Sequence, residues 1–225
     1  LMDDIEMAYP DKSERFSSMR YNLNRLKKLL QQVLDFRKIE NGKMTLHLSE
    51  GNIVAFIAQI GHNYFTPLME KKNIQFNFIA KEDNMVCYFD ADKIEKIIFN
   101  LLSNSYKYTQ TGGRVDLCIA PGEDNAIVIQ VKDNGMGIDK AEQAQIFNRF
   151  YSNKWKEVRD TNGIGLSVVK EMIEMHHGTI TVESEMNQGT VFTIRLPLGE
   201  NGFSPSELRE AHMLPLNDIS IPREY

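Results

Sequence analysis

Two asparagines and a lysine recur along one segment of the chain with the spacing of a single helix face. Asn100, Asn104 and Lys107 stand at i, i+4 and i+7 in NLLSNSYKYT, so a helix would align two amide oxygens and an ammonium group. Mg²⁺ takes hard oxygen ligands and keeps several waters, so these side chains could hold a hydrated ion and the phosphates it bridges. The ordinary alternative is the solvated face of a helix, and this pattern alone favours that alternative.

A glycine-rich turn, DNGMGI, follows an apolar segment that ends at Lys132. An aspartate at the end of a strand, with glycines that let the backbone approach a ring, can accept a hydrogen bond from the exocyclic amine of adenine. Guanine has a carbonyl at that position, and a buried hydrogen bond left unmade costs roughly 1–3 kcal/mol. A plain Asn-Gly turn explains Asp133, Gly135 and Gly137 equally well.

Two further segments carry residues that could contact phosphate. In NGIGL, Gly163 and Gly165 precede a segment with helical periodicity, and a helix N-terminus offers backbone N–H groups and the favourable end of its dipole to an anion. In IFNRFY, Arg149 lies between aromatic residues that could anchor a loop to the core, and its guanidinium could meet a phosphate. A tight loop and a surface arginine are the ordinary alternatives.

Hydrophobic periodicity predicts the elements that must position these residues. Apolar residues spaced by three and four over residues 13–39 predict a helix that packs on other helices. Further helices are expected at 52–70, 90–106, 140–147 and 165–177, and strands at 44–48, 74–80, 85–89, 114–120, 126–132, 179–184 and 189–198. Segregated helices and mostly antiparallel strands predict an α+β fold, a two-layer α/β sandwich preceded by a long helix.

Composition limits the classes of partner. The chain has 225 residues, of which 42% are hydrophobic, and its 26 basic and 31 acidic residues give a net charge of −5. This charge gives no electrostatic reason to expect nucleic acid or an anionic membrane as a partner. Cys87 and Cys118 each lie in an apolar run, which favours buried thiols in a reducing compartment over a disulfide or metal site. No apolar run approaches the roughly 20 residues that span a bilayer, and the first residues do not form a signal peptide.

Taken together, the four motifs resemble, in order and spacing, the N, G1, F and G2 boxes of sensor histidine kinases. The resemblance covers about residues 13–198. It implies the Bergerat-type ATP-binding sandwich shared with gyrase, Hsp90 and MutL relatives, with ATP and Mg²⁺ as cofactors and residues 152–162 as a mobile lid. It implies a metal site at Asn100 and Asn104, and a catalytic set of these two with Lys107 and Arg149. The nucleotide contacts that it implies are Asn104, Lys107, Tyr108, Asp133, Gly135, Gly137, Ile138, Phe150, Gly163, Ile164, Gly165 and Leu166.

Departures from the family pattern refine this expectation. In the ATP-hydrolysing relatives, a glutamate four residues before the Mg²⁺ asparagine activates water, and here Asn100 holds that place. An amide cannot act as a base, so hydrolysis should be poor and the γ-phosphoryl group left for a protein nucleophile. Thr161 stands where the G2 box usually begins with glycine, Asn148 replaces the usual acidic residue of the F box, and Ser105 replaces a common alanine.

The resemblance also implies a domain order. Residues 1–43 would be the end of the first helix, the turn and the second helix of a dimerisation and phosphotransfer hairpin, 44–198 the ATP-binding domain, and 199–225 a linker or extension. The phosphoacceptor helix would lie upstream. The whole protein would be a homodimer that serves a response regulator receiver domain, and this fragment the cytoplasmic portion of a membrane-anchored bacterial sensor, similar to hybrid sensors. Two alternatives stay open: a nucleotide-gated regulatory module and a degenerate dimerisation scaffold, both without phosphotransfer.

One histidine imitates a phosphoacceptor. In GHNYFTPL, His62 precedes Thr-Pro-Leu at the separation found in the phosphoacceptor box. The family's histidine is followed by an acidic residue and, three further on, often by a basic one, and Asn63 and Phe65 hold those places. Phe56, Ile60, Phe65 and Leu68 are expected to pack on the sheet, and Pro67 to require a bend or break in the helix. We therefore interpret His62 as a structural or surface residue.

Overall fold

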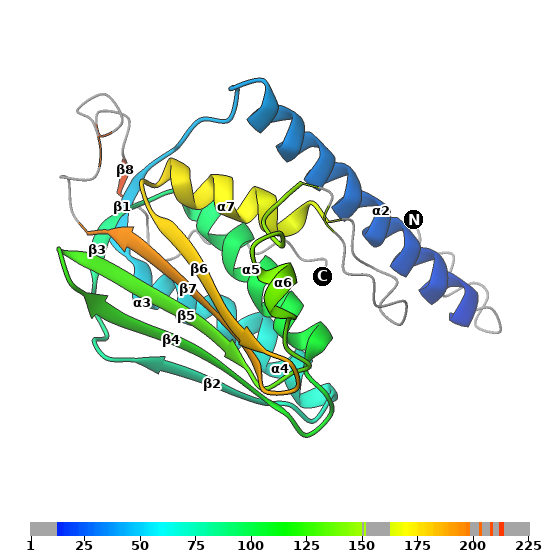
Figure 1. The fold of residues 1–225 in the computed structure, drawn as a ribbon. Coiled ribbons are helices and arrows are strands. Elements are labelled where there is room, and N and C mark those ends of the chain that lie inside the picture. The colour runs from blue at the N-terminus through cyan, green and yellow to red at the C-terminus, as the bar shows by residue number, and fades with distance from the viewer. Residues whose placement is uncertain are drawn as a thin grey trace. The chain divides into compact units, whose positions relative to one another are not determined.

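The computed structural model describes residues 13–149, 151, 163–198, 203, 208, 212 and 213. The chain divides into two compact units, residues 1–44 with 216–225 and residues 45–215. Figure 1 shows the elements of both, and each unit is described by itself.

The described part of the first unit is one long helix, α2 (Ser13–Glu40). Its last turn carries Arg37 and Lys38, whose positive charges suit the helix C-terminus, and Gly42 follows it with a φ of +60°. The predicted apolar stripe is present, and six apolar side chains of this helix are 45–56% exposed: Met19, Leu23, Leu26, Leu30, Val33 and Leu34.

The second unit is built on a five-stranded mixed sheet. Its order is β2 (Gln75–Ala80), β4 (Arg114–Gly122), β5 (Ala126–Asp133), β7 (Gly189–Pro197) and β6 (Thr179–Glu185). Strands β2 and β4 are parallel and the other neighbours antiparallel. A smaller sheet pairs β1 (Ser49–Asn52) with β3 (Val86–Phe89) and with β8 (His212–Met213).

Helices cover one face of the large sheet. They are α3 (Ile53–Ile60), α4 (Thr66–Lys71), α5 (Ala91–Tyr108) and α7 (Gly165–Met175), and the short α6 (Lys140–Gln143) lies near β6 (Figure 1). Ile97, Leu101, Leu117, Ile129 and Val169, from α5, the central strands and α7, are at most 1% exposed and form the core between the layers. The predicted α+β sandwich is confirmed.

The prediction of a strand at residues 44–48 was wrong. These residues have no regular structure, and the first strand begins at Ser49. The backbone N–H of His47 donates to the side chain of Asp90 at 2.8 Å, so this amide serves a side chain instead of a neighbouring strand.

The predicted helix over 52–70 contains a π-helical turn, Gly61–Phe65, between α3 and α4. It lies just before Pro67, which cannot donate a helical hydrogen bond and stands in the first turn of α4. The wider turn shifts the helical phase by about one residue, so Met69 is fully buried where Leu68 was expected, and Leu68 is half-buried. His62 is exposed, with its Nδ1 2.8 Å from the Ala58 carbonyl.

Candidate active site

Helix α5 carries the first predicted motif in full. Asp90 caps its N-terminus, and isoleucines and leucines fill its buried face. Asn100, Asn104, Lys107 and Tyr108 all lie on this helix and are half-buried, at its border with solvent. The amide nitrogen of Asn100 donates to the Lys96 carbonyl at 2.9 Å, so its carbonyl oxygen is the atom that a cation would use.

Lys72 fixes the end of this helix. Its Nζ donates to the backbone carbonyls of Tyr106 and Thr109, both at 2.7 Å, and lies 4.9 Å from the centre of the Tyr106 ring. A cation at a helix C-terminus meets the negative end of the dipole and binds carbonyls that the helix leaves unpaired. Partial burial lowers the pKa of Lys72. Nothing in the sequence pointed to this residue, which lies more than thirty positions from its partners.

Asp133 stands at the end of β5, as predicted, and its carboxylate connects two motifs. One oxygen, Oδ1, accepts the backbone N–H of Gly135 at 3.0 Å, and the other, Oδ2, accepts the hydroxyl of Ser105 on α5 at 3.1 Å. Burial raises the pKa of Asp133, while hydrogen bonds from Gly135, Ser105 and the backbone of Thr190 oppose that rise. The sequence marked Ser105 as unusual for the family but did not reveal its partner.

The glycines of the second motif are required by close backbone contacts. The N–H of Met136 donates to the Tyr108 carbonyl at 3.2 Å, and a Cβ on Gly135 would lie 2.5 Å from the same oxygen. Gly137 has a φ of +73°, and a Cβ there would overlap the Glu185 carbonyl. The turn therefore rests directly on the last turn of α5, which brings the first two motifs together.

Ile138 completes this turn through contacts that the sequence did not indicate. Its N–H donates to the Ser184 hydroxyl at 2.8 Å, and its carbonyl accepts from Gln143 at 3.0 Å. The Ser184 hydroxyl also donates to the Gly189 carbonyl at 2.7 Å. These bonds fasten the turn to α6 and to the hairpin formed by β6 and β7.

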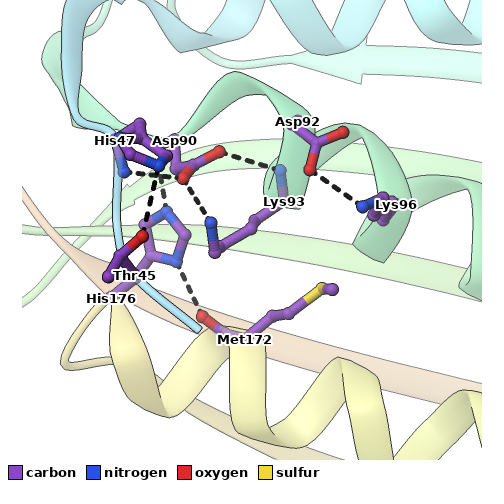
Figure 2. Close-up of polar contacts among 8 residues, drawn as sticks. All are labelled: Thr45, His47, Asp90, Asp92, Lys93, Lys96, Met172 and His176. Carbon is purple, nitrogen blue, oxygen red and sulfur yellow. Dashed lines mark hydrogen bonds and ion pairs between the residues drawn. The ribbon is translucent and has the colours of Figure 1, made fainter. Parts of the chain in front are cut away.

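A buried polar cluster joins the start of α5 to the end of α7 (Figure 2). His176 accepts the backbone N–H of Asp90 at its Nε2 (3.0 Å), and its Nδ1 lies 2.7 Å from the Met172 carbonyl, to which it donates. Both ring nitrogens are thus used by the neutral imidazole. Asp90 accepts from the Lys93 ammonium, from the Lys93 backbone and from the His47 backbone. The side chains of Asp90, Lys93 and His176 are all buried.

The cluster also indicates the relative direction of α5 and α7. Because the C-terminal end of α7 meets the N-terminal end of α5, the two packed helices run in opposite directions (Figure 1). The 11 residues of α7 span about 16 Å along this helix, so its start lies well away from the cluster.

The N-terminus of α7 has features that suit an anion. Gly163 has a φ of +64°, and Ile164 is buried and precedes the first helical residue, Gly165. No side chain caps this end among the described residues, so the N–H groups of Gly165 and Leu166 have no capping partner there. Gly163, Ile164, Gly165 and Leu166 thus lie at the start of a helix, as the sequence predicted.

Arg149 and its neighbours are described in part. The Arg149 guanidinium pairs with Glu171 on α7 at 3.5 Å, and both side chains are well exposed. An exposed pair of this length adds little stability. Phe147 stacks edge-on against Phe192 of β7 with ring centres 6.3 Å apart, which anchors the loop as expected. Phe150, Thr161 and the predicted lid at 152–162 lie outside the described residues.

The donor set fits a nucleotide with a hydrated ion better than a metal held by protein alone. Among the described residues, no group of three or more His, Cys, Asp or Glu side chains could hold a metal. A cation would instead use the amide oxygens on α5 together with phosphate and water.

The hydroxyl of Thr109, buried at the end of α5, lacks a hydrogen-bond partner within the described part of the chain. Buried hydroxyls usually have one.

Comparison with known proteins identifies the family. Residues 89–200 match the histidine kinase-, DNA gyrase B- and HSP90-like ATPase family. This part of the chain belongs to that ATPase family. As in that family, the domain is an ATP-binding one. No helix in the described part of the chain has the length and apolarity that a membrane span requires.

Individual histidine kinases resemble the chain over most of its length. Histidine kinase P4 of Formosa agariphila is 35% identical over 190 residues, which are 82% of this chain and 14% of that protein. Hybrid signal transduction histidine kinase D of Dictyostelium discoideum is also 35% identical, over 80% of this chain and 12% of its own length. The chain therefore spans only a small part of these relatives.

Solved structures share the fold. The catalytic domain of histidine kinase ThkA is 24% identical, with a TM-score of 0.61 over 68% of this chain and 99% of that one. Full-length ShkA in complex with AMPPNP is 22% identical, with a TM-score of 0.73 over 84% of this chain and 39% of that one.

Proposed function

We propose that this chain is the catalytic ATP-binding region of a two-component sensor histidine kinase that binds Mg-ATP and transfers the γ-phosphoryl group to a histidine upstream of this fragment. The observation that carries the proposal is the contact between the glycine turn after Asp133 and the last turn of α5. It brings the Asp133 carboxylate beside the helix that bears Asn104, Lys107 and Tyr108. The start of α7 would supply further backbone N–H groups.

The base would be recognised by Asp133. Its ionised carboxylate accepts hydrogen bonds only, so it can take the exocyclic amine of adenine and would face the carbonyl of guanine unfavourably. Gly135 and Gly137 allow the backbone to come close to the ring, and Ile138 and Phe150 would line the pocket as apolar contacts.

The phosphates would lie between the helices. The oxygens of Asn100 and Asn104 would hold Mg²⁺, and Lys107 and Tyr108 would contact phosphate or ribose. The segment Gly163–Leu166 offers the α7 N-terminus to the phosphates, and Arg149 turns from its weak pair with Glu171 towards the γ-phosphate. A bound Mg²⁺ would supply positive charge that stabilises the phosphates during transfer.

The amide at position 100 favours transfer over hydrolysis. Asn100 cannot deprotonate water, and its nitrogen is already bound to the Lys96 carbonyl. The γ-phosphoryl group would therefore be transferred to a histidine of the helical hairpin to which residues 1–43 contribute, and not to water. In the whole protein, we place residues 44–198 as the catalytic domain, 199–225 as a linker, the hairpin as the site of dimerisation, and the fragment on the cytoplasmic side of a membrane-anchored sensor.

The phosphohistidine would then donate to an aspartate of a response regulator receiver domain. A complex of histidine kinase ThkA with the response regulator TrrA has been crystallised, which supports such a partner here.

Titration of Mg-ATP and Mg-GTP into the parent and into Asp133→Asn tests the site. We expect the parent to prefer ATP and the variant to lose most of that preference, because an amide presents a donor as well as an acceptor. Asp124→Asn is the matched control, since Asp124 lies in the β4–β5 turn at the opposite end of β5 and has a φ of +57° that asparagine tolerates. A parent that binds no ATP would favour the degenerate scaffold and refute the proposal.

Transfer is tested by mixing the parent and [γ-³²P]ATP with a fragment that supplies the first hairpin helix. Acid-labile, base-stable label on that fragment is the expected result. ATP binding without such label would instead support the nucleotide-gated module.

A further inference from the structure

Ser105 connects the carboxylate of Asp133 to helix α5, which also carries Asn100 and Asn104. It lies on α5, is 1% exposed, and its Oγ is 3.1 Å from Asp133 Oδ2. The contact from Gly135 to Oδ1 comes from the aspartate's own turn, two residues away. The Ser105 hydroxyl is therefore a side-chain contact from outside that turn, and it binds the oxygen that Gly135 does not.

We propose that Ser105 is a positioning residue that sets the purine preference of this site, by donating to Asp133 Oδ2 and so keeping the carboxylate an oriented acceptor for a 6-amino group. The inference rests on the proposed function, because it assumes that Asp133 meets the base.

The chemistry of the carboxyl group gives the direction of the effect. An ionised carboxylate offers about two acceptor positions on each oxygen and no donor. Ser105 occupies one position on Oδ2 and leaves another for an amine. A neutral carboxyl group would instead present an O–H, which suits the 6-oxo group of inosine or guanosine nucleotides.

The surroundings of Asp133 make its charge depend on these donors. Burial raises the pKa of Asp133, and the groups that oppose the rise are Gly135 in the turn, Ser105 on α5 and the backbone of Thr190 on β7. None of these three carries a charge. Removing the hydroxyl would release Oδ2 and favour the neutral form, so both orientation and acceptor character would be lost.

Three nucleoside triphosphates that differ only at purine position 6 test the inference. ATP carries an amine, ITP an oxo group, and purine riboside triphosphate a hydrogen. For Ser105→Ala, calorimetric titration with Mg²⁺ should show ATP affinity about tenfold weaker, in line with one hydrogen bond to a charged group. The affinity of Ser105→Ala for purine riboside triphosphate should stay within about twofold of the parent's, since this nucleotide does not use the carboxylate. The ratio of ATP affinity to ITP affinity should fall in the variant.

Further variants separate positioning from folding. Ser103→Ala, two residues away on the same helix, should leave all three affinities unchanged. Ser105→Cys, whose thiol is a weaker donor, should give an intermediate loss for ATP. Adding Ser105→Ala to Asp133→Asn should cost nothing more for ATP, because the two side chains act as one unit.

The outcomes are distinguishable from failure of the proposed function. Equal loss of all three nucleotides by Ser105→Ala would show a structural role and overturn the inference. An unchanged ATP to ITP ratio would also overturn it, even if the parent binds ATP and Asp133→Asn abolishes the preference. A parent that binds no ATP would refute the proposed function and this inference with it.

Discussion

Replacing Asp90 with alanine would remove several bonds at once from the start of α5. Its Oδ1 caps the helix at the Lys93 N–H (3.1 Å), and its Oδ2 accepts from the His47 N–H (2.8 Å) and from the Lys93 ammonium. The Lys93 side chain is only 6% exposed. Alanine would therefore leave a buried, uncompensated charge.

The expected cost is a large part of the stability of the domain. Breaking a buried pair by removing one partner costs about 3–5 kcal/mol, and loss of an N-cap costs about 1 kcal/mol. We expect Asp90→Ala to lower the free energy of unfolding by about 4–6 kcal/mol, against about 5–15 kcal/mol for a typical domain. Urea denaturation followed by circular dichroism measures this difference.

Asp92→Ala is the matched control on the same helix. Asp92 pairs with Lys96 at 2.9 Å, but the two side chains are 67% and 30% exposed (Figure 2). Exposed helix pairs contribute about 0.3–0.5 kcal/mol, so this variant should unfold close to the parent. A double variant, Asp90→Asn with Lys93→Met, should recover most of the loss, because it keeps a capping side chain and removes the buried charge.

A loss below about 1 kcal/mol for Asp90→Ala would refute this reasoning. It would mean that the Lys93 ammonium reaches water when its partner is removed. Failure of the double variant to recover stability would show instead that the bond to His47, and not the charge, carries most of the effect.

Three other substitutions give further tests. Burial lowers the pKa of His176 below its usual 6.5, so as the pH falls the unfolded chain takes up a proton before the folded chain does. The free energy of unfolding should therefore fall below about pH 6.5, by up to about 1.4 kcal/mol per pH unit. In urea denaturation between pH 7 and pH 5, His176→Gln should weaken this dependence, whereas His62→Gln, at an exposed position, should not. Lys72→Met should lower the free energy of unfolding by about 1–3 kcal/mol through loss of two bonds to the α5 terminus, and a melting temperature equal to the parent's would contradict that role. Gly189→Ala should destabilise more than Gly112→Ala, because both glycines have positive φ but only a Cβ at 189 meets a backbone carbonyl; equal thermal shifts would argue against the clash.

Local patterns predicted the elements that depend on local forces. The apolar face of α5 and its polar border at Asn100 and Asn104 follow from helical spacing within one segment, and α5 has both where expected. The Asp133 turn after β5 was likewise evident from the change from alternating apolar residues to glycines.

Contacts between distant segments could not be predicted in this way. Residues 44–48 alternate like a strand, yet the His47 amide binds Asp90, 43 positions away. The helical phase at Leu68 and Met69 depends on a π-helical turn just before Pro67, which periodicity does not show. Ser105 was recognisable as a departure, but its bond to Asp133 depends on how α5 packs against β5.

The pairing of β8 with β1 has a consequence for chain topology. Ser49 lies opposite His212 in parallel strands, so the chain begins and ends its path through the second unit at adjacent positions. Loops elsewhere in the second unit can therefore lengthen or shorten without separating these two paired strands.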